Sequence, residues 1–85
     1  MYFVYVLQSD LNNQHYVGYT TDIKRRIAIH NKRKVSSTKH YAPWRLIFTE
    51  TYTNKEDALR KEKYFKTTVG KRALKIMLKE TLRST

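Results

Sequence analysis

The chain has no cysteine among its 85 residues, so it can form neither a disulfide framework nor a thiolate metal site. Its three histidines lie at positions 15, 30 and 40, too scattered for a metal-binding pair of the His-Glu-x-x-His kind. The sequence also lacks a glycine-rich phosphate loop, a nucleophile elbow, a paired-carboxylate signature and an internal repeat. Any active site must therefore have an arrangement of side chains other than these standard motifs.

Long apolar runs are missing as well. No run approaches 18 apolar residues, and the amino terminus is strand-like, without a basic segment ahead of an apolar one. We therefore expect a soluble, cytoplasmic chain with no membrane partner. A chain of this length makes one domain, residues 1–85, whose small core buries roughly 60–65% of the unfolded surface.

Acidic residues are few: 7 Asp and Glu stand against 18 Lys and Arg, a formal net charge of +11. Solubility alone needs a net charge of only about 2–8 in magnitude. The positive charges are spread along the chain, so they do not form one basic tail. We expect nucleic acid, in the form of DNA, as the partner, ahead of an anionic membrane or an acidic protein.

The amino-terminal part predicts a β-hairpin. Residues 2–7 and 15–19 are rich in β-branched and aromatic side chains, and residues 9–13 have turn chemistry. The pattern does not fix the register of the two strands. Adjacent strands still bring Tyr5 and Tyr16 within reach of each other.

A first helix is predicted from residue 21 or 22 to about residue 31, because Thr and Asp are good N-caps. Ile23 and Ile27 form its apolar stripe. Helical spacing places Arg26 and His30 at the edge of that buried stripe. The alternative is that Arg26 only covers apolar surface with its stem and that His30 is a boundary residue.

Residues 32–44 are irregular and basic, and loops of about a dozen residues without periodicity are often functional. Tyr41 and Trp44 could stack on bases, although Trp44 could instead cap the core at the start of a third strand over residues 45–52. Five basic side chains of this segment are predicted to contact phosphates: Lys32, Arg33, Lys34, Lys39 and His40.

A second helix is predicted to begin at Asn54, and it carries one carboxylate, Glu62, on the apolar face that includes Phe65. Ionised carboxylates are seldom buried without a partner. Three interpretations stay open: a metal-binding or catalytic carboxylate, a buried ion pair with Arg26, or a position at the rim. The phosphate contacts expected from this helix are Lys63 and Lys66.

The last helix is predicted over about residues 70–82. Its opposite face carries a basic stripe that is either solvated or part of a phosphate track. The complete prediction is a small α+β domain, a three-stranded antiparallel sheet flanked by helices in the order ββαβαα. The expected apolar face of the last helix consists of Ala73, Leu74, Met77, Leu78 and Leu82.

The order of these features resembles the GIY-YIG nuclease superfamily, in particular its short standalone bacterial members. Residues 3–5 (Phe-Val-Tyr) and 16–18 (Tyr-Val-Gly) resemble its paired motif, and residues 16–26 run from that motif into an arginine helix. Residues 58–63 resemble the helix that supplies the family's glutamate. Phe3 stands where the family prefers glycine, and no asparagine follows Asn54, whereas many members have one beyond the glutamate helix.

The resemblance implies the role of each residue. Tyr16 and Tyr5 would orient or deprotonate the attacking water, and Arg26 would stabilise charge on the phosphoryl oxygens. His30 would assist proton transfer. Glu62 would bind one Mg²⁺ or Mn²⁺ ion, with no small-molecule cofactor.

The implied function is a metal-dependent endonuclease that hydrolyses DNA phosphodiester bonds, directed by structure or weakly by sequence, with DNA repair or recombination as the expected setting. The alternative is a nucleic-acid-binding module with degenerate or absent catalysis. A structural protein of the ribosome or nucleoid would explain the charge but not Glu62.

Overall fold

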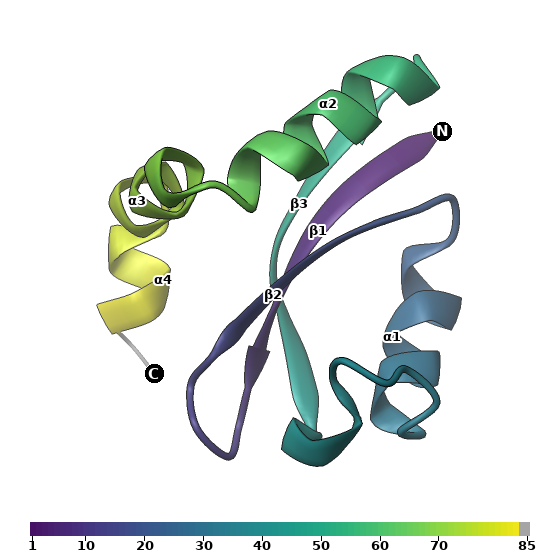
Figure 1. Ribbon diagram of the computed structural model, residues 1–85, viewed down its shortest axis with the longest axis vertical. Helices are drawn as coiled ribbons and strands as arrows, with labels where there is room; N and C mark the ends of the chain where they lie inside the picture. Colours follow the sequence, from purple (N-terminus) through teal and green to yellow (C-terminus); the bar gives the residue numbers. More distant parts are fainter. Residues whose placement is uncertain (84–85) are drawn as a thin grey trace.

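The computed structural model describes residues 1–83, which form a three-stranded antiparallel sheet with helices on both faces (Figure 1). The strand order is β2-β1-β3, so β1 is central and β2 is an edge strand. The elements are β1 (Tyr2–Ser9), β2 (His15–Thr20), α1 (Ile23–Asn31), the 3₁₀ turn η1 (Lys39–Tyr41), β3 (Trp44–Tyr52), α2 (Lys55–Phe65), α3 (Thr68–Met77) and α4 (Lys79–Arg83). The predicted α+β fold is confirmed.

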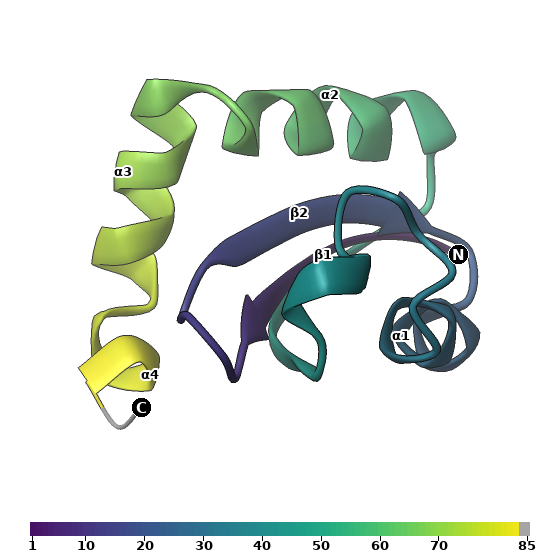
Figure 2. The ribbon, with the colours of Figure 1, turned by 60° about the horizontal axis from the view of Figure 1, so that its bottom comes forward.

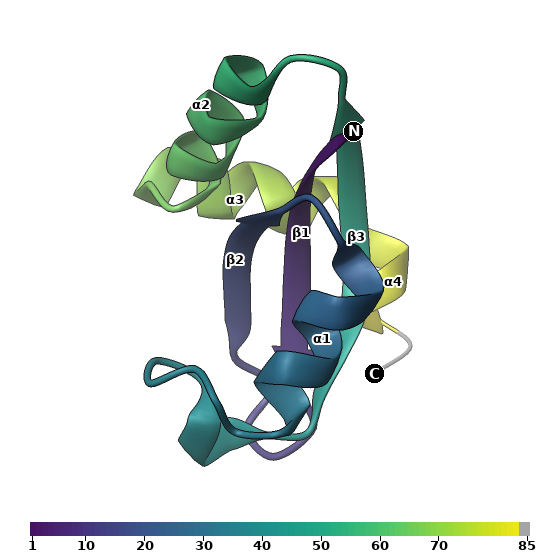
Figure 3. The same cartoon turned by 90° about the vertical axis from the view of Figure 1, so that its right-hand side faces the viewer.

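The central strand β1 separates two apolar clusters, because its successive side chains point to opposite faces. Val4 and Val6 pack with α2 and α3, whereas Tyr5 and Leu7 pack with the side of the sheet that α1 covers. Figure 2 shows α2 on one side of the sheet and α1 on the other, with α3 running past the end of the sheet, and Figure 3 shows α1 lying across β1 and β3. All four of these β1 side chains are buried.

Side-chain caps fix where the helices begin. The Asp22 carboxylate accepts a hydrogen bond from the Arg25 backbone N–H at 3.1 Å. Asn54 Oδ1 accepts from the Glu56 N–H at 2.8 Å, so both helix starts expected from the sequence are confirmed. Within residues 1–83, no helix is both long and apolar enough to cross a membrane.

The carboxy-terminal helix expected over residues 70–82 is wrong as one unit, because it breaks at Leu78, which has φ −103° and ψ 24°. The buried stripe of α3 recurs every four residues, at Gly70, Leu74 and Leu78. Met77 falls outside that stripe and is exposed, contrary to the expected apolar face. After the break, Leu82 of α4 still packs against the core.

The register of the hairpin depends on one close contact. Tyr5 lies opposite Gly18 and Leu7 lies opposite Tyr16. A Cβ atom at Gly18 would overlap Cζ and Oη of the Tyr5 ring. Glycine is therefore required at position 18 so that the Tyr5 ring can cross over β2, with its hydroxyl above the neighbouring strand.

We expect Gly18→Ala to destabilise the fold by about 1–3 kcal/mol, the usual cost of overpacking a well-packed site. Urea unfolding measures this change. The control is the same substitution in a Tyr5→Leu background, where the clash is relieved and the additional cost should fall below about 0.5 kcal/mol. An equal cost in both backgrounds would show that the Tyr5 contact is not the cause.

Candidate active site

Three buried side chains form a hydrogen-bonded chain between the sheet and α1. The Tyr5 hydroxyl lies 2.9 Å from His30 Nε2. His30 Nδ1 lies 2.8 Å from the Thr38 hydroxyl, which comes from the segment between α1 and β3. All three residues are at most 1% exposed. This polar chain fixes the angle of the imidazole and of the phenol.

The environment holds the members of this chain in their neutral forms. Burial, with a smaller effect of the Arg26 charge, lowers the pKa of His30 to about 4. Burial also raises the pKa of the Tyr5 phenol, although its hydrogen bond from Arg26 acts in the opposite direction. At neutral pH the site therefore contains a protonated phenol beside an uncharged imidazole.

The donor directions follow from the partners of Tyr5. Arg26 Nε donates to the Tyr5 oxygen at 3.4 Å, and Arg has no acceptor atom, so the phenol oxygen accepts on that side. The phenol proton is then free to point to His30 Nε2. In that tautomer Nδ1 carries the histidine proton and donates to Thr38, whose hydroxyl lies 3.5 Å from the Val35 carbonyl as its own acceptor.

Arg26 lies at the outer end of this chain and is half-buried. The hydrogen bond to Tyr5 is the main cause that raises the pKa of Arg26 above its ordinary value. The guanidinium borders a hollow of about 230 Å³, which is also lined by Thr20 and Arg25. Tyr5 holds Nε, and Tyr16 adds a smaller stabilisation of the same guanidinium charge.

Tyr16 is the accessible phenol of the pair. Its ring centroid lies 6.4 Å from that of Tyr5 and 5.0 Å from that of His30, so the expected proximity of the two tyrosines is confirmed. Tyr5 is buried, whereas Tyr16 is only partly buried and lies on the edge strand. Tyr5 therefore acts on Arg26 and His30, and Tyr16 is the phenol that a bound molecule can reach.

Glu62 approaches from α2, on the opposite face of the sheet, beside the edge strand β2. Its side chain is 22% exposed and forms an ion pair with Lys66 at 3.2 Å. Lys66 Nζ also lies 5.8 Å from the centroid of the Tyr16 ring. The ion-pair partner of Glu62 is therefore Lys66, so the alternative of a buried pair with Arg26 is wrong, and the metal-binding role of Glu62 stays a prediction.

One carboxylate is a minimal cation site. Within residues 1–83, no group of three or more His, Cys, Asp or Glu side chains is arranged to hold a metal ion. Mg²⁺ keeps several waters and is commonly bound through one or two carboxylates together with substrate phosphates. Glu62 fits that mode of binding, in which the remaining ligands come from water and from the phosphodiester.

The basic residues predicted to contact phosphates separate into two groups. Lys66 lies at the site, between Glu62 and Tyr16, whereas Lys63 is exposed on α2. Trp44 is buried and its indole N–H donates to the Thr38 carbonyl at 2.9 Å, so it belongs to the core. The loop residues are exposed and make no described contact with the phenols, Arg26 or Glu62: Lys32, Arg33, Lys34, Lys39 and His40.

Thr38 is a site residue that the sequence does not reveal. It lies in an irregular segment without periodicity, where nothing distinguishes it from Ser36 and Ser37 beside it. The structure separates them, because Thr38 is buried and the two serines are exposed. Its role is to hold the ring of His30.

We expect the His30 ring to remain uncharged down to about pH 4, well below the ordinary histidine value of about 6.5. Because the folded pKa is depressed, His30 contributes its full stability above about pH 6.5, and this contribution is lost as the pH falls through about 4. NMR titration of the ring protons measures the midpoint, with His30→Gln to assign the signal. A midpoint near 6.5 would contradict the buried, hydrogen-bonded arrangement.

Residues 1–75 match the model of the GIY-YIG catalytic domain. A UPF0213 protein of Streptococcus pneumoniae is 40% identical over 65 residues, which are 75% of this chain and 65% of the pneumococcal protein. The chain thus spans just under two thirds of that relative. A UPF0213 protein of Staphylococcus epidermidis is 35% identical over 77 residues, covering 89% of this chain and 93% of the relative.

A solved structure agrees with these matches. The solution NMR structure of a UPF0213 protein from Bacillus halodurans is 34% identical, covers 91% of this chain and 85% of its own, and superposes with a TM-score of 0.56. The two tyrosine motifs, the arginine helix and the glutamate helix occur in the expected order within the matched residues. The chain belongs to the GIY-YIG family of catalytic domains.

Proposed function

We propose that this domain is a divalent-metal-dependent endonuclease that hydrolyses DNA phosphodiester bonds. The observation that carries the proposal is that the Tyr5 hydroxyl has a fixed guanidinium and an accessible phenol beside it, Arg26 and Tyr16. The Glu62 carboxylate acts electrostatically on the same Tyr5 phenol, and its partner Lys66 reaches the Tyr16 ring. Membership of a nuclease family supports the reaction class. The net charge of +11 supports a polyanionic substrate.

Arg26 is suited to bind the phosphoryl group. Tyr5 holds Nε, so the terminal nitrogens can donate to two non-bridging oxygens and neutralise the charge that develops as water attacks phosphorus. Preorganisation matters here, because a donor already fixed by the fold needs no reorganisation during the reaction.

Tyr16 and the buried chain complete the set of protein groups. The Tyr16 oxygen would position the attacking water by accepting a hydrogen bond from it. To take up the water's proton as the oxygen–phosphorus bond forms, Tyr16 would first have to release its own proton to solvent, and the leaving oxygen, whose bond to phosphorus breaks, would take a proton from solvent. His30 is buried and contacts Tyr5, so in this proposal it acts through Tyr5 and keeps the phenol proton directed away from Arg26. Thr38 in turn orients His30.

Glu62 would hold one Mg²⁺ or Mn²⁺ ion. When bound, the ion would supply Lewis acidity to the phosphodiester and a template for in-line displacement. Lys66 now neutralises the Glu62 carboxylate and would have to leave it. Helical i,i+4 pairs on a surface are worth about 0.3–0.5 kcal/mol, and the Lys66 end of this pair is exposed, so Lys66 can move away from the carboxylate at a small cost in free energy.

The described residues offer contacts to phosphates and no motif that reads bases. Within residues 1–83, no helix-turn-helix, zinc finger or other base-reading motif is present, and the contacts on offer suit phosphates. We propose that DNA structure, or a weak sequence preference, selects the cleavage position, as in repair or recombination intermediates.

Glu62→Gln should abolish Mn²⁺-dependent cleavage of branched, nicked and duplex DNA, because the amide cannot replace the carboxylate as a cation ligand. Binding of DNA in EDTA should change less than about twofold, and the melting temperature should hardly move, since a helical i,i+4 pair with an exposed lysine contributes little. A gel-based nuclease assay beside anisotropy and thermal melts measures all three. No cleavage by the wild-type protein, with DNA binding intact, would leave the alternative of a binding module without catalysis.

Arg26→Lys should reduce cleavage by about 10²-fold or more, the range seen on loss of a preorganised donor to a developing oxyanion. Lysine keeps the charge but loses the planar fork and the Nε–H bond to Tyr5. The matched control is Arg60→Lys, which lies in an exposed pair with Asp57 and should cleave at the wild-type rate. Wild-type cleavage by Arg26→Lys would mean that only overall charge matters, and equal losses at both positions would mean that the loss is not specific to the guanidinium of Arg26.

A further inference from the structure

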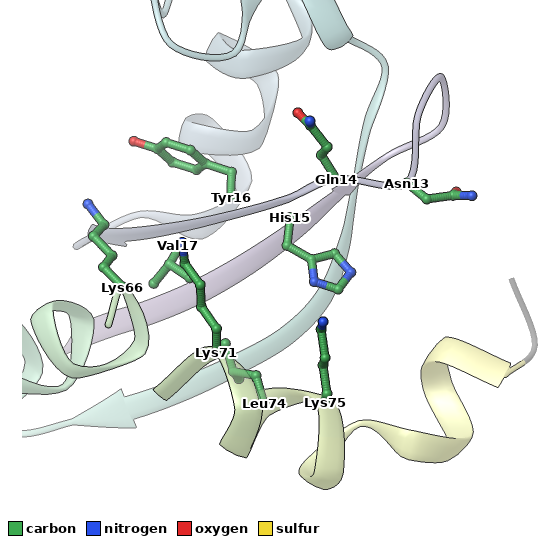
Figure 4. A pocket seen from close by; sticks show the side chains of 9 residues that line it. All are labelled: Asn13, Gln14, His15, Tyr16, Val17, Lys66, Lys71, Leu74 and Lys75. Carbon is green, nitrogen blue, oxygen red and sulfur yellow. The ribbon is translucent and has the colours of Figure 1, made fainter. Parts of the chain in front are cut away.

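A second basic feature lies beside the proposed site, between the edge strand β2 and the start of α3. It is a groove of about 620 Å³ (Figure 4). A volume of this size is in the range of small-ligand pockets, about 300–1,000 Å³, and suits a short stretch of one strand. The lining side chains used below are His15, Tyr16, Lys66, Lys71, Leu74 and Lys75.

The groove follows the open edge of β2. Residues 13–17 are consecutive and all line it, although successive side chains of a strand point to opposite faces. A groove on one face of the sheet would be lined by alternate residues only. Because consecutive residues line this groove, it follows the edge of the strand. Among residues 1–83, β2 pairs with no strand other than β1, so the backbone N–H groups on its outer edge have no partner strand and are available as donors.

Three lysines from two helices give the groove its charge. Figure 4 shows Lys66, Lys71 and Lys75 directed toward β2, with the Lys75 amine pointing at the His15 ring. No Asp or Glu lines the groove, and within residues 1–83 neither Lys71 nor Lys75 forms an ion pair. Partial burial, and then the Lys75 charge, lower the pKa of His15. The charges of Lys71 and Lys75 are therefore uncompensated among the described residues, whereas that of Lys66 is paired with Glu62.

The spacing of the lysines suits a strand of nucleic acid. Lys71 and Lys75 are four apart on α3, so their Cβ atoms lie about 5–6 Å from each other on one face. This separation lets the two ammonium groups contact neighbouring phosphates. Val17 and Leu74 provide an apolar floor, and the rings of His15 and Tyr16 offer surfaces for a sugar or a base.

The groove is continuous with the proposed active site. Tyr16 and Lys66 belong to both the groove and the proposed active site. The hollow beside Arg26 lies next to Tyr5, the other tyrosine of the pair. A strand bound across Tyr16 would thus have phosphate donors on each side of it, from α1 on one side and from α3 on the other.

We propose that this groove binds the backbone of one nucleic-acid strand next to the scissile phosphate, with Lys71 and Lys75 on successive phosphates. The proposal rests on the proposed nuclease function, because it takes Tyr16 as the point where the strand crosses the site. It assigns the main strand contact to α3 and the edge of β2, and not to the basic loop between α1 and β3.

The experiment compares two double variants with the same loss of charge. Lys71→Gln with Lys75→Gln removes the groove cations, and Arg72→Gln with Lys79→Gln removes two exposed cations that do not line the groove. Binding of a fluorescein-labelled single-stranded DNA is measured by anisotropy in EDTA across a salt series. Binding is thereby read separately from cleavage.

We expect the groove variant to lower the salt slope by about 1.4, from two phosphate contacts on a single strand, and to weaken binding about 25-fold at 0.1 M salt. The matched variant should keep the wild-type slope and lose no more than about twofold. Equal losses in the two variants, or an unchanged groove variant, would overturn the proposal.

A third variant guards against misfolding. Lys71→Arg with Lys75→Arg keeps both charges and should bind like the wild type, and all variants should melt as the wild type does. If the arginine variant binds as weakly as the glutamine variant, the lysines act through structure and the proposal fails. Binding is measured in EDTA, so its result does not depend on cleavage. If the protein does not cleave DNA, the proposed nuclease function is wrong, but the test of the groove is still valid.

Discussion

The hydroxyl of Tyr5 is the point at which the central strand, the first helix and the loop after it are joined. It lies between a guanidinium and an imidazole, and it can do so only because the facing residue on β2 has no side chain. Gly18 of the second motif and Tyr5 of the first are thus structurally coupled, because the tyrosine ring fits only over a glycine. Without the ring crossing above Gly18, Arg26 and His30 would both lose the Tyr5 hydroxyl as a hydrogen-bond partner.

The two faces of the sheet differ in composition and in function. The face under α2 and α3 is apolar, with Val4, Val6 and Phe65 at its centre, and it supplies most of the packing. The face under α1 contains the buried polar chain, in which every member has a hydrogen-bond partner. Buried polar groups of this kind are tolerated when they are satisfied, and they then specify one geometry.

Part of this arrangement could be predicted from the sequence, because it depends on local patterns. The hairpin follows from period-two segments around a turn, and the phase of α1 follows from Ile23 and Ile27, which correctly placed Arg26 and His30 against the buried face. The helix starts at Asp22 and Asn54 follow from cap chemistry. The sequence left several interpretations of Glu62 open, because helical phase alone does not show where the helix lies relative to the edge of the sheet.

The rest depends on contacts between distant segments. The register requires knowing that Tyr5 crosses Gly18, and the burial of Thr38 depends on the path of an irregular loop. The helix break at Leu78 could not be predicted from the sequence, because no proline or glycine lies near it. The groove joins residues 13–17 to α3, which lies some fifty residues further along the chain.

The lysines beside β2 also have a consequence for the protein in isolation. An edge strand with unpaired backbone groups is a template on which a second chain can add a strand, and natural proteins commonly guard such edges with charged side chains, lysine especially. Two copies that met along this edge would bring Lys66, Lys71 and Lys75 of one against the same three of the other. The repulsion disfavours self-association and β-aggregation, so the charges that make the edge attractive to a polyanion make it unattractive to another copy of the same chain.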